Sequence, residues 1–87
     1  MLTLDDLAPQ DSGVIRRVHG HGLALDRLLA LGFTPGTEVI RLFSAPFGDP
    51  LVFRVRGSTL AIGRAQARQI ELREKNKREK STTFLPL

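Results

Sequence analysis

The chain has 87 residues, a formal net charge of +4 and no cysteine. Its length fits one domain, since domains usually run to about 100–150 residues, and so small a core leaves little material for a deep active-site cleft. The absence of cysteine excludes disulfides, thiolate metal sites and cysteine nucleophiles, and no stretch approaches the roughly 18 consecutive apolar residues of a membrane span.

The first predicted elements are a strand and a helix. Residues 14–18 are short and rich in β-branched side chains between glycine-containing turns, which is typical of a strand. Residues 23–31 carry leucine and alanine at helical spacing over an arc of roughly 160°, which predicts an amphipathic helix. Gly32 after the last leucine, followed by Pro35, predicts the end of this helix.

Two strands and a hairpin tip follow the helix. Pro35-Gly36 favours a type II turn, after which two half-buried strands are predicted, over 37–43 and over 51–56. In the first, Ile40 and Leu42 alternate with Val39, Arg41 and Phe43, and in the second, Leu51, Phe53 and Val55 alternate with Val52, Arg54 and Arg56. The connection 45–50 contains two prolines and one glycine, which predicts a hairpin tip with Phe47 at its end. Two phenylalanines lie within the strands and are expected to be buried, Phe43 and Phe53.

The remaining elements complete a small β fold. Gly57 allows a sharp return into a strand over 58–62, residues 63–68 form a turn or short helix, and Ile70 with Leu72 begins a last strand. Closely spaced short strands favour closure, because closure protects their edges. We therefore predict a mainly β fold, a small SH3-like barrel of about five strands with one short α-helix between the first two strands. An OB-like barrel is the alternative.

The composition changes near Arg73. Residues 1–73 hold nine arginines, seven acidic residues and no lysine, whereas residues 74–87 hold all three lysines. We expect a folded domain over 1–73 and a charged extension over 74–87, whose first half can form a frayed helix. The apolar tip of the extension is either disordered or docks on a partner or a second copy of the chain, which predicts a homo-oligomer joined through Phe84, Leu85 and Leu87.

No residue pattern points to catalysis, a metal or a cofactor. His19 and His21 supply two imidazoles, whereas zinc and iron sites use three or four ligands, so a solvated loop is the interpretation adopted. A phosphate-binding loop needs Gly-Lys-Ser/Thr at a helix start, and residues 1–73 contain no lysine. The serines lie in turns without a nucleophile-elbow pattern. We expect a binding protein without cofactor or metal, not an enzyme.

Two kinds of binding fit the charges and the helix. Arg54 and Arg56 share one strand face, and a basic stripe for nucleic acid would extend them with Arg16, Arg17 and Arg41. The chain has no Trp or Tyr on which bases stack, so nucleic acid is not the expected partner. The apolar arc of the helix exceeds the roughly 100° that a core-facing helix needs. Either the core takes the whole arc, or part of it forms a docking patch with Leu28 or Leu31 and Phe33.

Three segments of the chain together resemble ferrous iron transport protein A, the FeoA family. They are residues 27–36 (RLLALGFTPG), 45–50 (APFGDP) and 57–62 (GSTLAI), and the resemblance covers roughly Leu2 to Leu72. The His19-Gly20-His21 loop and the extension beyond Arg73 match no motif of the family.

The resemblance implies a cytoplasmic accessory protein that does not insert into the membrane. Its partner would be FeoB, the membrane ferrous iron transporter with a GTP-binding domain, and FeoB would carry out the nucleotide chemistry and the transport. We expect the chain to regulate or assemble this transporter by docking onto its cytoplasmic part. In this hypothesis an arginine orients the contact and apolar side chains anchor it, with the contacts made by Arg27, Leu28, Leu31, Phe33 and Phe47.

Overall fold

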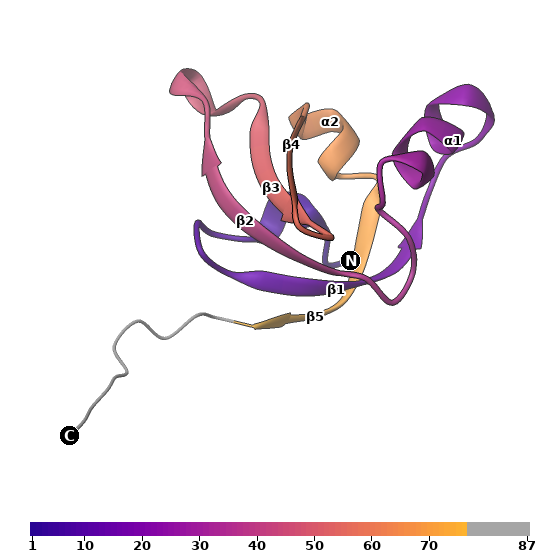
Figure 1. Ribbon diagram of the computed structural model, residues 1–87, viewed down its shortest axis with the longest axis horizontal. Coiled ribbons are helices and arrows are strands. Elements are labelled where there is room, and N and C mark those ends of the chain that lie inside the picture. The colour runs from indigo at the N-terminus through magenta and orange to yellow at the C-terminus, as the bar shows by residue number, and fades with distance from the viewer. Residues whose placement is uncertain (77–87) are drawn as a thin grey trace.

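A computed structural model describes residues 1–76 of the chain. It contains five strands, β1 (Ser12–Val18), β2 (Glu38–Ser44), β3 (Leu51–Val55), β4 (Ser58–Ile62) and β5 (Ile70–Asn76). The helix α1 (Gly22–Ala30) lies between β1 and β2, and the one-turn helix α2 (Arg64–Ala67) lies between β4 and β5 (Figure 1). Two 3-10 turns are η1 (Leu4–Asp6) and η2 (Pro46–Gly48). Neither α1 nor α2 is long and apolar enough to cross a membrane.

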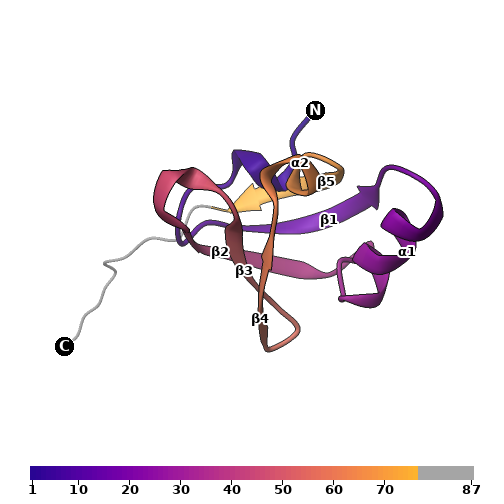
Figure 2. The same cartoon turned by 90° about the horizontal axis from the view of Figure 1, so that it is seen from above.

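The strands form one antiparallel sheet that curls into a small barrel (Figure 2). The strand order is β4-β3-β2-β1-β5. β1 pairs with β2 only through residues 12–14 but with β5 along its whole length, and register shifts follow Val14 and Ile15. The N-terminal segment also joins β5, where the Leu72 N–H donates to the Leu2 carbonyl at 2.8 Å. The predicted mainly β architecture, with one short helix between the first two strands, is confirmed.

One apolar core fills the barrel. The rings of Phe33 and Phe53 meet edge to face, with centroids 6.4 Å apart and planes at 89°. This is a favoured geometry for aromatic pairs, because the positive edge of one ring faces the negative face of the other. Buried side chains come from every strand and from both helices, namely Leu4, Leu7, Ile15, Leu28, Phe33, Val39, Leu51, Phe53, Val55, Ile62, Ala67, Ile70 and Leu72.

The C-terminal turn of α1 directs Leu28 and Phe33 into this core. Gly32 has φ +111°, the Phe33 N–H donates to the Leu28 carbonyl at 3.2 Å, and the Gly32 N–H donates to the Leu29 carbonyl at 3.0 Å. These paired bonds define a Schellman motif, which brings the residue after the glycine against the last turn of the helix. Leu28 is 1% exposed and Phe33 is 0% exposed. The expectation that these two residues belong to a surface docking patch is therefore wrong.

Strand β2 departs from the expected burial at two positions. Arg41 is only 7% exposed, because its side chain points inward and donates to the Leu7 carbonyl and to Ser44 Oγ. Burial lowers the pKa of the Arg41 guanidinium, and the nearby charge of Arg64 lowers it further. Phe43, expected to be buried, is 56% exposed. The β2–β3 pairing shifts register between Arg41 and Phe43, which interrupts the alternation on which the expectation depended.

Strand β5 continues past Arg73, where the folded domain was expected to end. Glu74, Lys75 and Asn76 pair with Val14, Gly13 and Ser12 of β1. The expected helix is therefore wrong over these three residues, which are strand. The rest of the extension, including Phe84, Leu85 and Leu87, lies outside the described residues, and docking through its tip stays a prediction.

Replacing Leu28 tests whether it belongs to the core. Leu28→Ala should lower the free energy of unfolding by about 2–5 kcal/mol, because it removes buried methyl groups and leaves a cavity. Leu31→Ala, at the exposed side of the same helix, should change it by less than about 0.5 kcal/mol. Urea denaturation followed by circular dichroism measures both values. Equal effects of the two substitutions would contradict the packing described.

Candidate functional site

Helix α1 lies at one end of the barrel (Figures 1 and 2), and it carries an exposed apolar stripe. Leu23 is 79% exposed, and Leu31, the C-cap residue of α1, is 41% exposed. The exposed Arg27 lies between them in the sequence. Residues four apart share a helix face, so these three side chains form one surface, which we call the α1 stripe. The opposite face packs on the barrel through Leu28. Arg27 and Leu31 are thus at the surface, as expected. Leu23 lies four residues before Arg27, and this repeat of four is the signal that identifies it as the third member.

The turn after α1 holds the stripe in place relative to the sheet. The Thr37 N–H donates to the Thr34 carbonyl at 3.1 Å and Gly36 has φ +88°, as in a type II turn. The predicted Pro35-Gly36 turn is confirmed. The Gly36 N–H also donates to the Ile15 carbonyl at 2.7 Å, so the turn is anchored on β1.

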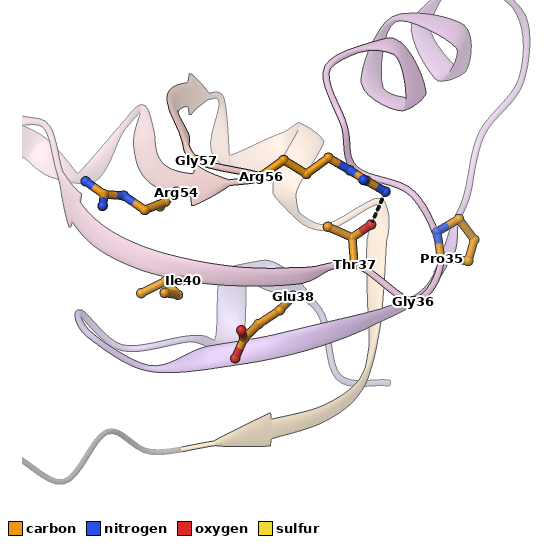
Figure 3. A pocket seen from close by; sticks show the side chains of 8 residues that line it. All are labelled: Pro35, Gly36, Thr37, Glu38, Ile40, Arg54, Arg56 and Gly57. Carbon is orange, nitrogen blue, oxygen red and sulfur yellow. Dashed lines mark hydrogen bonds between the residues drawn. The ribbon is translucent and has the colours of Figure 1, made fainter.

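Arg56 ties this turn to the β3–β4 hairpin (Figure 3). Its Nη2 donates to Thr34 Oγ1 at 3.0 Å and to Thr37 Oγ1 at 2.9 Å. Arg56 has φ +50° and Gly57 has φ +82°, as in the type I′ turns that join adjacent strands. A positive φ is unfavourable for a residue with a Cβ, and hydrogen bonds from a charged donor offset that cost. Arg56 therefore holds the turn after α1 against the β3–β4 hairpin, although its side chain lies at the surface.

An open groove of about 540 Å³ lies beside this tie, between the Pro35-Gly36 turn and the exposed sides of β2 and β3. The side chains of Arg54 and Arg56 extend in opposite directions there, and Glu38 projects from β2 (Figure 3). The groove combines two cations with a carboxylate. Arg41 is buried, so the basic stripe considered for nucleic acid cannot include it, and the expectation that it would is wrong. The lining residues are Pro35, Gly36, Thr37, Glu38, Ile40, Arg54, Arg56 and Gly57.

His19 lies in a loop with its side chain partly exposed, and it also pairs with a carboxylate, a contact that the sequence did not predict. His19 Nε2 lies 2.8 Å from Glu71 Oε1, and Arg16 Nε lies 3.6 Å from Glu71 Oε2. The hydrogen bond with His19 is the main cause that holds the pKa of the Glu71 carboxyl below its usual value, and the charges of Arg16 and Arg17 act in the same direction. His21, just before α1, is exposed. Within residues 1–76 no three His, Asp or Glu side chains group together to hold a metal ion.

Phe47 lies far from the α1 stripe. Its side chain is fully exposed. The connection between β2 and β3, which carries Phe47, and the helix α1 are at opposite ends of the barrel in both views (Figures 1 and 2). The five residues expected to contact a partner are thus divided. Two are together on α1, two are in the core, and Phe47 is alone at the other end.

Comparison of the sequence with known proteins points to one family. The family model of the FeoA domain matches residues 2–74. An Fe(2+) transport protein A/Fe(2+) transporter FeoB fusion protein of Porphyromonas gingivalis is 32% identical over 71 residues, which are 82% of this chain and 8% of that protein. The chain thus spans less than a tenth of the length of this relative.

Solved structures share the fold. The solution structure of iron(II) transport protein A from Clostridium thermocellum has a TM-score of 0.78 at 30% identity, over 82% of this chain and 44% of that chain. The crystal structure of Stenotrophomonas maltophilia FeoA complexed with zinc, described as a prokaryotic SH3 domain protein, has a TM-score of 0.79 at 27% identity, over 91% and 100% of the two chains. The predicted SH3-like barrel is confirmed.

The pairing of Glu71 predicts a loss of stability in acid. Its pKa is lower in the folded chain, so its contribution is present above the unfolded-state pKa of about 4.3 and is lost as the pH falls through the lower folded-state value. Between about pH 5 and pH 3, the free energy of unfolding should fall more steeply in the unmodified chain than in Glu71→Gln. Glu74→Gln, at an exposed carboxylate, is the control and should keep the steeper slope. Identical slopes in all three proteins would contradict the pairing.

Proposed function

Because the chain belongs to the FeoA domain family, which is associated with ferrous iron transport, we propose that it is a cytoplasmic accessory protein that binds the FeoB-type membrane transporter. The observation that carries this proposal is the Porphyromonas gingivalis relative, in which the two kinds of protein are joined in one chain. Proteins that are joined in one chain in some organisms commonly contact each other. In this arrangement the chain binds the transporter, and the transporter carries out the nucleotide chemistry and the transport.

The surface proposed for this contact is the α1 stripe. Leu23 and Leu31 are exposed, and Arg27 between them has no ion-pair partner among residues 1–76. Fully burying one leucine side chain contributes about 1.5–3 kcal/mol, and an arginine at the centre of an apolar contact supplies direction through its planar fork of donors. Aromatic and arginine anchors within apolar patches are the usual carriers of binding energy at protein interfaces.

The position of the stripe also supports a docking role. The Schellman turn and the bond from Gly36 to Ile15 hold α1 firmly at the end of the barrel. A contact surface that is already ordered loses little conformational entropy on binding. The stripe is therefore available without rearrangement of the core.

The first test is calorimetric titration of the chain into its cognate FeoB-type transporter in lipid nanodiscs, with GTP and GDP analogues compared. We expect saturable binding. An affinity that depends on the nucleotide indicates regulation of the transporter, and an affinity independent of the nucleotide indicates assembly. Absence of both heat and co-migration would refute the proposed function.

Substitutions on α1 test the proposed surface. The double variant Leu23→Ser with Leu31→Ser should weaken the affinity by about 10- to 100-fold, because two apolar side chains no longer enter the interface. Arg27→Glu should weaken it as well, whereas Arg73→Glu on β5 carries the same charge change and should leave it unaltered. Circular dichroism checks that each variant is folded. Equal losses for Arg27→Glu and Arg73→Glu would indicate a general effect of charge and not the α1 stripe.

A further inference from the structure

The tip between β2 and β3 holds a phenylalanine in a backbone conformation that suits glycine. The Gly48 N–H donates to the Ala45 carbonyl at 2.9 Å, which closes a turn with Pro46 and Phe47 at its two central positions. Phe47 has φ +75° and ψ +4°, the values of the third residue of a type II turn. That position normally takes Gly or Asn, because a Cβ is disfavoured at positive φ. Phe47 is therefore strained.

The side chain of Phe47 gains no contact within residues 1–76 that offsets this strain. Among residues 1–76, two other non-glycine residues have positive φ, Gln10 and Arg56. The side chain of Arg56 gains two hydrogen bonds to threonines, and the side chain of Gln10 is polar and exposed, so water solvates it. Phe47 combines a strained backbone with a fully exposed aromatic ring. A strained backbone position whose side chain gains no contact among the described residues points to a contact outside them.

The tip is held firmly, so the ring is presented in a fixed place. Arg64 Nη2 donates to the Gly48 carbonyl at 2.8 Å, and the Nη1 of the same guanidinium pairs with Asp5 of η1. Asp49 Oδ1 accepts a hydrogen bond from the Arg64 N–H at 2.9 Å. The base of the tip is closed by the Ala45 N–H, which donates to the Pro50 carbonyl at 2.9 Å. These bonds connect the tip to α2 and to the N-terminal segment.

We propose that Phe47 is an anchor that inserts into an apolar pocket on the cytoplasmic part of the transporter. The inference rests on the proposed function and adds a second contact at the end of the barrel opposite the α1 stripe. A protein pocket fits the tip better than a lipid surface does. Anionic lipid surfaces favour apolar residues that are surrounded by unpaired Lys or Arg side chains. Here Arg64, the cation that bonds to the tip, is already bound to Asp5 and Gly48, and the exposed Asp49 adds a negative charge.

Substitutions at position 47 separate the cost of folding from the gain in binding. Phe47→Gly and Phe47→Asn fit a positive φ, so their midpoints of urea unfolding should equal or exceed that of the unmodified chain. Both should bind the cognate transporter in nanodiscs about 10- to 100-fold more weakly, because an aromatic side chain is no longer buried. Phe47→Leu keeps an apolar side chain and should retain part of the affinity.

The outcomes distinguish this inference from the proposed function. If the unmodified chain does not bind the transporter, both are overturned. If it binds and the glycine and asparagine variants bind equally well, only the role of Phe47 is overturned. If the unmodified chain binds empty phosphatidylglycerol nanodiscs and Phe47→Gly does not, the partner of Phe47 is lipid, and the proposal of a protein pocket is overturned. A lower unfolding midpoint in both variants would show that Phe47 stabilises its own chain, contrary to the premise.

Discussion

The C-terminal turn of α1 is the constraint on which most of the structure depends. The positive φ of Gly32 lets the chain reverse, so that Phe33 reaches back to Leu28 and both side chains enter the core. A Cβ at Gly32 would lie 3.3 Å from Val55 Cγ1, so the close approach of the helix end to β3 also favours glycine. Phe33 then packs on Phe53. Because one face of α1 is fixed in this way, the α1 stripe on its other face is held outward.

The features that the sequence predicts well are those set by a few neighbouring residues. The glycine stop of α1, the Pro35-Gly36 turn and the hairpin tip over 45–50 each depend on the φ that Gly or Pro allows. The choice of Leu28 over Leu31 for the core depends on packing across the barrel, which periodicity does not contain. The burial of Arg41 depends on where its side chain finds acceptors within the barrel, and the pair of His19 with Glu71 joins residues 52 positions apart. Such contacts follow from the folded topology and leave no local signal.

Two arginines connect turns that would otherwise be independent. Arg56 joins the α1–β2 turn to the β3–β4 hairpin, and Arg64 joins the β2–β3 tip to the N-terminal segment. A guanidinium presents several donors in a rigid plane, so one side chain can satisfy two acceptors at once, which the point charge of a lysine does less well. This property suits a domain in which residues 1–73 contain arginine and no lysine. Both ends of the barrel owe their order to such contacts.

The separation of the α1 stripe from Phe47 has a consequence for binding strength. Burying one large apolar side chain contributes about 1.5–3 kcal/mol, whereas a micromolar complex requires about 8 kcal/mol. Neither end of the barrel supplies that amount through one or two side chains. When both ends contact the same partner, the second contact forms within a complex that already exists, and its effective concentration is set by the rigidity of the connection. The short, tightly paired sheet between the two ends is such a connection, so the packing around Phe33 and Phe53 bears on recognition at both ends even though neither ring reaches the surface.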